Sequence, residues 1–351
     1  MTSERDLYFR AVAADCELSV IAPLYMGERF VAELVSRLQA ALNTVTDDFE
    51  IVLIDDGSRD QTWLRIVEAA GKDSRVRGIR LSRNFGQHCA LTAGIDVARG
   101  RWLVVMDGDL QDRPEDVPKL YHAVLGGSCD VVIARRHLQQ LSAFKKLSSS
   151  VFNWALSKLG DIETHQQIGN FRIFSRKVAD AYRLYREQSR LLPALMARLG
   201  FSIGFLNVER SARADGGSTY NLRRLVRLAT DAIIANSEKP LRLGIHLGAL
   251  LSLFAMVLVA WALIRKLVYG VNIDGWTSVF IAVSFFSGVQ LSFSGLIAIY
   301  VGRIFNETKR RPIYILADCV NTRSSIRQVP FSIGESLENR SFSAKLDKVR
   351  G

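Results

Sequence analysis

Two long stretches without a charged side chain constrain the fold of this chain more than any other feature. Residues 243–264 and 275–302 contain no Asp, Glu, Lys or Arg. Each is longer than the roughly 20 residues with which an α-helix crosses a hydrocarbon core of about 30 Å. Because the connection between the two stretches is short, we expect a hairpin of two transmembrane helices at these positions.

The charges that flank the hairpin predict its orientation. Lys239 and Arg242 precede the first stretch, and Arg303 and the run Lys309-Arg-Arg311 follow the second. Basic residues next to membrane spans favour the cytoplasmic side. We therefore expect a multi-pass protein of the inner (cytoplasmic) membrane whose large domain lies in the cytoplasm. These residues also supply part of the formal net charge of +11, so the charge does not require a nucleic-acid partner.

The segments around the hairpin have their own patterns. Residues 221–242 resemble an amphipathic juxtamembrane helix, with arginines lying away from an apolar stripe; an ordinary helix packed on a protein core is the alternative. Residues 303–351 form a basic cytoplasmic segment with a possible short strand at 312–316, and we expect it to be largely disordered after about residue 320. The N-terminal extension, residues 1–17, is polar and does not have the pattern of a signal peptide.

Between these segments, apolar runs alternate with helical patterns. Runs without polar alternation are typical of strands covered on both faces, and residues 28–42 show the apolar spacing of an amphipathic helix. This alternation predicts an α/β domain with a doubly wound, mostly parallel sheet, which we place at residues 18–220. The expected strands are residues 18–22, 50–54, 76–81, 102–106 and 130–134, with a short one near 169–176.

Acidic and amide side chains follow two of these strands. Asp55 and Asp56 come directly after residues 50–54, and Asp107, Asp109 and Gln111 follow the strand at 102–106. Ligands bind at the carboxyl ends of the strands in an open α/β sheet. Carboxylate and amide oxygens suit a hard divalent cation that keeps positions open for a phosphate-bearing substrate. The alternative for each pair of aspartates is a solvated turn that caps the next helix.

Several other classes of protein lack the motif that they need. The four cysteines are scattered without the spacing of metal ligands, and we expect them to be reduced thiols. No Gly-x-Gly-x-x-Gly follows the first strand, which argues against a dinucleotide-dependent oxidoreductase. No nucleic-acid-binding motif is recognisable either.

The motifs together resemble family 2 glycosyltransferases of the GT-A fold. More narrowly, they resemble the polyprenyl-phosphate sugar transferases, the group of dolichol-phosphate mannose synthase and the bacterial undecaprenyl-phosphate glycosyltransferases. The motifs that carry the resemblance are Asp55-Asp-Gly-Ser-x-Asp60, Arg83-Asn-Phe-Gly86, Met106-Asp-Gly-Asp-Leu-Gln-Asp-x-Pro-Glu115, Gly169-x-Phe-Arg172, and Gly217-Ser-x-Tyr220 leading to Pro240-Leu-Arg242. The resemblance implies a GT-A catalytic domain, an amphipathic juxtamembrane helix and a two-helix membrane anchor.

The resemblance also implies roles for the residues at the strand ends. Asp109, Asn170 and Arg172 would be catalytic. Asp107, Asp109 and Gln111 would hold Mg²⁺ or Mn²⁺ against the diphosphate of a nucleotide-sugar. The residues implied to bind that donor are Pro23, Tyr25, Glu28, Asp55, Asp56, Asn84, Gly86 and Asp107.

The implied acceptor is a polyprenyl phosphate, undecaprenyl phosphate in a bacterium. Its oxygen is already anionic near neutral pH, so the site mainly needs cations that bring two anionic groups together. Direct attack on the anomeric carbon would invert its configuration. The candidates for this acceptor site are Arg135, Arg210, Arg213 and Ser218, although for any one arginine taken alone a solvated surface charge is the more common explanation.

Two departures from the family pattern leave the sugar open. Pro23-Leu-Tyr-Met-Gly-Glu28 stands where Pro-Val-Tyr-Asn-Glu is usual, and Asn170 replaces a frequent aspartate. Hexoses, N-acetylhexosamines and deoxyamino sugars all fit, and the bacterial pattern favours UDP over GDP. Two rivals remain: a processive polysaccharide synthase, whose Gln-x-x-Arg-Trp motif is missing, and a non-catalytic nucleotide-binding membrane protein. A homo-oligomer would enlarge the thin two-helix anchor.

Overall fold

The strands of this protein form one mixed sheet in the computed structural model, which describes residues 15–127, 129–136, 168–188, 190–208, 237, 239–269 and 275–322. Within these residues the sheet has eight strands in the order β7-β5-β6-β4-β1-β2-β3-β8. Their bounds are Cys16–Leu24 (β1), Phe49–Asp55 (β2), Val76–Leu81 (β3), Gly100–Val105 (β4), Val131–Arg136 (β5), Ile168–Ser175 (β6), Ile203–Val208 (β7) and Leu316–Val320 (β8).

Most neighbouring strands run parallel, as the alternation of strands and helices predicts. β1 pairs in parallel with β2 and β4, β2 with β3, and β5 with β7. The exceptions are β6, which is antiparallel to β4 and β5, and β8, which is antiparallel to β3. The mostly parallel α/β sheet is therefore confirmed. Of the two antiparallel strands, β6 lies between β5 and β4, and β8 lies at the edge of the sheet beside β3.

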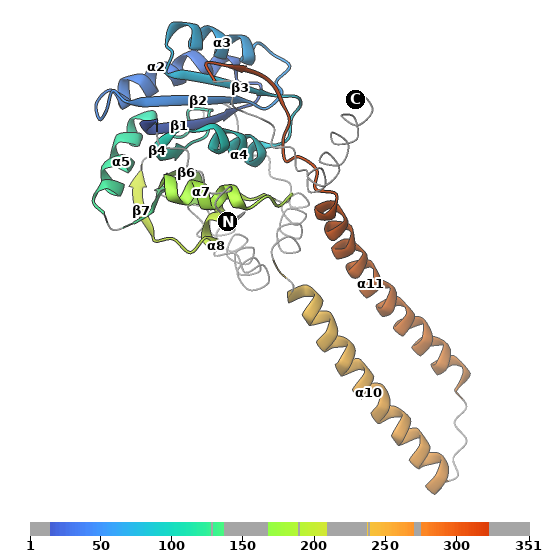
Figure 1. The fold of residues 1–351 in the computed structure, drawn as a ribbon. Helices are drawn as coiled ribbons and strands as arrows, with labels where there is room; N and C mark the ends of the chain where they lie inside the picture. The colour runs from blue at the N-terminus through green and yellow to red at the C-terminus, as the bar shows by residue number, and fades with distance from the viewer. Residues whose placement is uncertain are drawn as a thin grey trace, which may run out of the picture.

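Helices cover both faces of the sheet, and each face has its own apolar core (Figure 1). α2 (Glu28–Leu42), α3 (Thr62–Lys72) and α5 (Val117–Leu125) pack on one face. α4 (Gln87–Val97), α7 (Arg176–Leu184) and α8 (Leu192–Arg198) pack on the other. A 3₁₀ turn, η1 (Pro114–Asp116), leads directly into α5.

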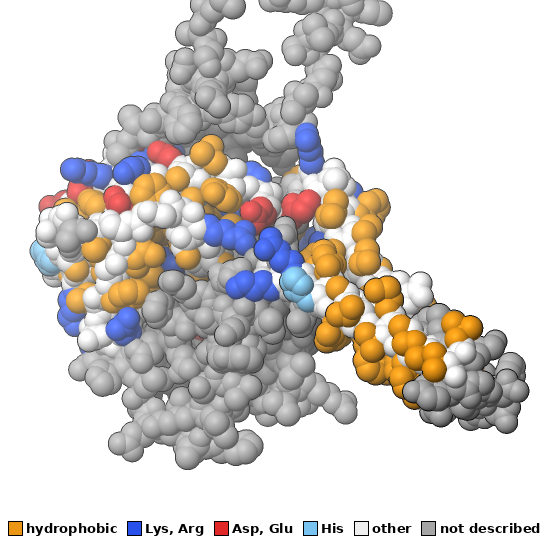
Figure 2. Space-filling view, turned by 90° about the horizontal axis from the view of Figure 1, so that it is seen from below, with side chains coloured by type: hydrophobic (Ala, Val, Ile, Leu, Met, Phe, Trp, Pro, Cys, Tyr) orange, Lys and Arg blue, Asp and Glu red, His pale blue; other side chains and the backbone are white. Residues whose placement is uncertain are grey.

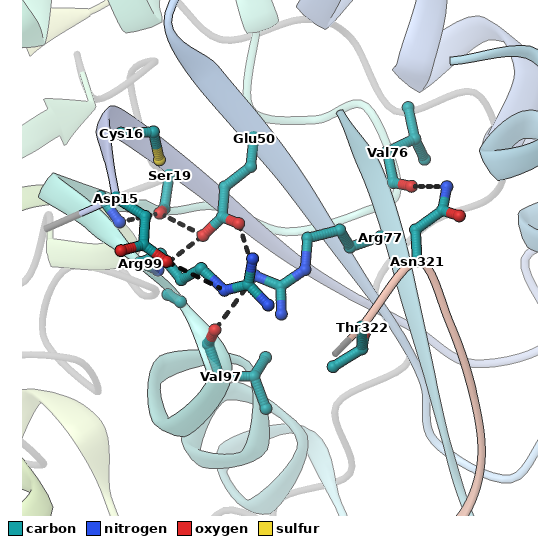
Figure 3. A network of polar contacts seen from close by, with 12 residues as sticks. Asp15, Cys16, Ser19, Glu50, Val76, Arg77, Val97, Arg99, Asn321 and Thr322 are labelled. Atoms are coloured by element: carbon teal, nitrogen blue, oxygen red, sulfur yellow. Dashed lines mark hydrogen bonds and ion pairs between the residues drawn. The ribbon is translucent and has the colours of Figure 1, made fainter. Parts of the chain in front are cut away.

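A buried polar network closes the sheet at the amino ends of the strands (Figure 3). Glu50 Oε1 accepts hydrogen bonds from the hydroxyl of Ser19 (2.7 Å) and the backbone N–H of Arg99 (2.6 Å), and its Oε2 accepts one from Arg77. Burial, with Glu50 nearby, raises the pKa of the Cys16 thiol to about 12. The four cysteines form no disulfide.

Two long helices, α10 (Lys239–Tyr269) and α11 (Trp276–Thr308), extend side by side away from the sheet (Figure 1). They pack closely near Gly244, where an added Cβ would lie 2.6 Å from Cε1 of Phe293. By length and composition, one described stretch, Phe285–Thr308, could cross a membrane, and the apolar run Gly244–Leu258 is shorter. Hydrophobic side chains cover the helical pair, and Lys and Arg gather where it meets the sheet (Figure 2).

The structure corrects one element after the hairpin. A strand was expected at residues 312–316, but the strand is Leu316–Val320. The carbonyl of Ile315 accepts a hydrogen bond from the N–H of Ser82 at 2.9 Å, and regular pairing with β3 begins only at Leu316. Most of the predicted amphipathic segment 221–242, the extension before residue 15 and the tail after residue 322 lie outside the described residues.

Candidate active site

The carboxyl ends of β1, β2 and β4 meet at one edge of the sheet because these strands are parallel neighbours. Their register places Leu24 opposite Asp55 and Ile21 opposite Val105. A pocket of about 340 Å³ opens above these ends. It is lined by Pro23, Leu24, Tyr25, Gly27, Phe30, Asp56, Asn84, Gly86, Gln87, Asp107, Gly108 and Asp109.

Asp56 organises the loop on one side of the pocket. Its carboxylate accepts the backbone N–H of Phe85 at 2.8 Å and that of Gly86 at 2.9 Å. Gly57 lies directly against this loop with a φ of +67°, and a Cβ there would come within 2.4 Å of the carbonyl carbon of Arg83. Burial raises the pKa of Asp56, although the two backbone donors favour its charged form. These contacts hold Asn84 and Gly86 at the pocket wall.

Asp55 lies beneath the pocket rather than in its lining. Its side chain is fully buried, and Oδ1 accepts the backbone N–H of Ser58 at 2.9 Å. Oδ2 has no hydrogen-bond partner among the described residues, although Nε of Arg80 lies 3.4 Å away. A buried carboxylate oxygen with spare acceptor capacity is costly to a folded protein, so the nearby guanidinium of Arg80 is the charge that offsets this cost.

The loop after β4 brings two carboxylates to the pocket. The N–H of Asp107 donates to Oδ2 of Asp112 at 3.0 Å, which folds the loop back on itself. Oδ1 of Asp107 accepts hydrogen bonds from the side-chain amides of Gln87 and Asn170. Leu110 takes a φ of +61°, an unusual conformation for a non-glycine residue. This turn presents Asp109 to the pocket.

The side chains at this pocket supply only part of the ligands that a divalent cation needs. Among the described residues, no three His, Cys, Asp or Glu side chains are grouped as metal ligands. Asp107 and Asp109 offer carboxylate oxygens, whereas the amide nitrogen of Gln111 donates to Oδ2 of Asp109 at 2.6 Å. Gln111 would have to turn its amide to offer oxygen. Two carboxylates with open positions suit Mg²⁺ or Mn²⁺ shared with a diphosphate.

Two predicted catalytic residues approach the pocket from β6, whose Arg172 pairs with Val105 of β4. Asn170 donates to Asp107 at 3.2 Å. Arg172 is 1% exposed and donates to the carbonyl oxygens of Gly169 (2.8 Å) and Asn170 (3.1 Å). Burial lowers the pKa of Arg172 to about 10, so the side chain stays charged at neutral pH. Arg172 therefore fixes the strand end that carries Asn170.

Two residues near the site are not marked by any pattern in the sequence. Gln87, at the first position of α4, lines the pocket and binds Asp107. His88 is held neutral, because burial, with Arg172 and Arg190 adding to it, lowers its pKa to about 4. An isolated Gln or His has no spacing that marks it, and only the packing of α4 against β1, β2 and α7 reveals these two.

Other predicted residues lie away from the pocket lining. Glu28 accepts the backbone N–H of Gln61 at 2.9 Å and so links the starts of α2 and α3. The guanidinium of Arg135 lies 4.4 Å from the ring centroid of Phe205, at the end of β5. Arg210, Arg213 and Ser218 lie outside the described residues.

Comparison with known proteins gives a consistent family. A model of glycosyl transferase family 2 matches residues 19–183. An uncharacterized glycosyltransferase of Synechocystis sp. is 32% identical over 302 residues, which cover 86% of this chain and 95% of the relative. An undecaprenyl-phosphate 4-deoxy-4-formamido-L-arabinose transferase of Aeromonas hydrophila is 32% identical over 314 residues, or 89% of this chain and 96% of the relative.

One solved structure is more distantly similar. Glucosyl-3-phosphoglycerate synthase from Mycobacterium tuberculosis, in complex with Mn²⁺ and UDP-glucose, is 18% identical. The alignment covers 65% of this chain and 81% of that protein, with a TM-score of 0.46. That degree of similarity is too low to support an inference.

Proposed function

The chain belongs to glycosyl transferase family 2, and we propose that it moves a sugar from a nucleotide-sugar to a polyprenyl phosphate at the cytoplasmic face of the membrane. The observation that carries the proposal is the convergence of Asp56, Asp107 and Asp109 on one pocket from two different strand ends. Three carboxylates in one pocket suit a ligand that brings hydroxyl donors and a bound cation.

The donor fits the pocket as a nucleoside diphosphate sugar. Pro23, Tyr25 and Asn84 line the part of the pocket where we place the base and ribose, with Asp56 holding the loop behind them and Asp55 beneath. Asp107, Asp109 and Gln111 would hold Mg²⁺ or Mn²⁺ against the diphosphate. That cation would supply Lewis-acid neutralisation of the charge on the departing nucleoside diphosphate.

The transfer itself is a single displacement. A phosphate oxygen of the acceptor attacks the anomeric carbon and forms a new C–O bond while the bond from that carbon to the nucleoside diphosphate breaks. The leaving group takes the electron pair, and the anomeric configuration inverts. Since the attacking oxygen is already anionic, no strong general base is needed, and Asn170 is suited to position the sugar by hydrogen bonds although it carries no charge.

The acceptor proposal is supported by the relatives named for undecaprenyl phosphate and by the stretch Phe285–Thr308, which is long and apolar enough to cross a membrane. Cations must offset the repulsion between a lipid phosphate and the donor diphosphate. We assign this role to Arg135, Arg210 and Arg213, with Arg172 adding positive charge beneath the site and Ser218 donating a hydrogen bond to the acceptor phosphate. UDP is the carrier that we favour.

The membrane arrangement completes the proposal. We propose that residues 243–264 and 275–302 both cross the inner membrane, with residues 18–220 as the cytoplasmic catalytic domain and 221–242 at the interface. Large apolar side chains on both helices are open to the surroundings, among them Ile245, Met256, Leu267 and Leu291, which are 66%, 66%, 80% and 72% exposed. Apolar patches of this extent fit lipid rather than water.

A transfer assay tests the proposal. Purified protein, Mn²⁺ or Mg²⁺ and undecaprenyl phosphate are mixed with radiolabelled UDP- and GDP-sugars, and label that enters the organic phase is counted. We expect label from one donor, lost on adding EDTA. Nucleotide binding without transfer to any acceptor lipid would instead support a non-catalytic binding protein, and label in long polymer would support a processive synthase.

A further inference from the structure

The chain returns to the catalytic sheet after α11 and adds β8 beside β3 (Figure 1). Val320 pairs with Gly78 and Asp318 with Arg80. Gly78 leaves the room that this strand occupies, since a Cβ there would lie 2.8 Å from Cγ1 of Val320. The side-chain amide of Asn321 then donates to the carbonyl oxygens of Ala70 (2.7 Å) and Val76 (2.9 Å). The chain after α11 is therefore part of the α/β domain.

A second set of contacts fastens the segment between α11 and β8. The hydroxyl of Tyr314 donates to Oδ2 of Asp96 at 2.7 Å, and Arg186 forms a bidentate pair with the same carboxylate at 2.7 and 3.0 Å. Burial and the neighbouring Asp96 raise the pKa of Tyr314, so its hydroxyl stays protonated and can donate. The N–H of Gln188 donates to Glu307 at the end of α11 at 2.9 Å.

This segment contacts two residues, Ser82 and Arg80, that lie next to the pocket but do not line it. The N–H of Ser82, where the loop to Asn84 and Gly86 begins, donates to the carbonyl of Ile315 at 2.9 Å. Arg80 lies between two carboxylates, with Nε 3.4 Å from Oδ2 of Asp55 and Nη1 3.8 Å from Oδ2 of Asp318. Asp55 is fully buried, whereas the side chain of Asp318 is 55% exposed.

We propose that residues 314–320 are a positioning element of the donor site, with Asp318 acting through Arg80 on Asp55. The guanidinium of Arg80 is partly exposed and can turn toward water, which would leave the buried Asp55 carboxylate without a nearby cation. Asp318 on the outer side keeps Arg80 in place, and the Ile315 carbonyl fixes the start of the loop that carries Asn84. The ligand concerned is the nucleoside diphosphate of the donor, so this inference rests on the proposed function.

The test uses full-length protein with Asp318→Asn. We expect its affinity for UDP with Mn²⁺, or for GDP if the wild type prefers GDP, to fall about two- to fivefold, the range of an exposed ion pair. The KM for the sugar donor rises by the same factor, whereas the KM for undecaprenyl phosphate and the thermal midpoint stay unchanged. Asp318→Glu, which keeps the carboxylate, should retain the nucleotide affinity of the wild type. Tyr314→Phe, which removes only the hydroxyl held by Asp96, weakens nucleotide binding in the same direction.

The matched control is Glu187→Gln, because Glu187 and Arg198 form a similarly exposed pair with the same 3.8 Å separation away from the pocket. It should leave nucleotide affinity unchanged. Equal nucleotide affinity in the wild type and Asp318→Asn overturns this inference while the proposed function stands. If neither nucleotide binds the wild type, the proposed function fails first and takes this inference with it.

Discussion

The two ends of the sheet use carboxylates in opposite ways. At the amino end, both oxygens of Glu50 are engaged by Ser19, Arg77 and the N–H of Arg99, and the side chain is 7% exposed (Figure 3). At the carboxyl end, Asp107 and Asp109 face a pocket. A buried charge must be paired within the protein, whereas a carboxylate on a pocket can bind an external cation. Position in the sheet therefore separates a structural acid from a ligand-binding one.

Of the changes at the two ends of the sheet, removing the carboxylate of Asp109 should have the largest effect, a loss of sugar transfer. In Asp109→Ala we expect transfer to fall by at least about 100-fold, because a bound cation contributes several kcal/mol of charge stabilisation. The variant should remain folded and membrane-bound. Initial rates of label transfer measure the loss, and Asp47→Ala, an exposed carboxylate near the amino end, is the control. Wild-type turnover in Asp109→Ala would refute the metal assignment.

Changing Glu50, at the amino end, should instead lower the free energy of unfolding. Glu50→Gln leaves Arg77, whose side chain is 5% exposed, without its counter-charge. Breaking a buried pair typically costs about 3–5 kcal/mol of unfolding free energy. Chemical unfolding followed by the fluorescence of Trp63 and Trp102 measures this cost. Nucleotide affinity per folded molecule should not change. A loss of affinity without a loss of stability would mean that Glu50 serves ligand binding rather than structure.

His88 sharpens the comparison, because burial next to Arg172 and Arg190 keeps it neutral beneath the carboxyl end. Its pKa is lowered to about 4 in the folded protein from an ordinary 6.5. The unfolded chain therefore takes up a proton first as pH falls, and unfolding free energy drops between pH 6.5 and 4, by up to about 3 kcal/mol. Stability measured against pH checks this. Nδ1 of His88 accepts the N–H of Leu192 at 3.5 Å. His88→Asn keeps an acceptor at this place and should flatten the curve of stability against pH; an unchanged curve would contradict the assignment.

Among the changes at the two ends of the sheet, the smallest effect is expected at Asp56. Asp56→Asn retains one oxygen acceptor but loses the charge that strengthens the bonds from Phe85 and Gly86. Nucleotide affinity should fall about fivefold, since hydrogen bonds to charged groups exceed neutral ones by about 1 kcal/mol. Calorimetry measures the affinity. A fall in affinity of about 100-fold or more would mean that Asp56 contributes mainly through direct contact with the ligand rather than through the loop that it holds.

The sequence predicted those elements that local pattern determines. Residues 28–42 form α2 as their apolar spacing predicts, and the strand at 76–81 has the expected bounds. The pocket gathers Asp56, Asn84, Asp107 and Asp109 because parallel strands end at one edge.

Contacts set by tertiary packing were not predictable in this way. The position of β8 depends on its pairing with β3, the burial of Asp55 depends on the loops above it, and the contacts of Gln87 and His88 depend on how α4 docks. Two membrane spans were expected from the absence of charge, and one described stretch meets the criterion of length and hydropathy.

Mn²⁺ binding is the most direct test of the central claim that the β4 end of the sheet holds a metal-bound nucleoside diphosphate. Wild type and Asp109→Ala would each be titrated with Mn²⁺, with and without UDP or GDP, while free Mn²⁺ is followed by electron paramagnetic resonance. We predict that nucleotide strengthens Mn²⁺ binding to the wild type and that Asp109→Ala abolishes this coupling. Equal, nucleotide-independent binding by both proteins would contradict the account.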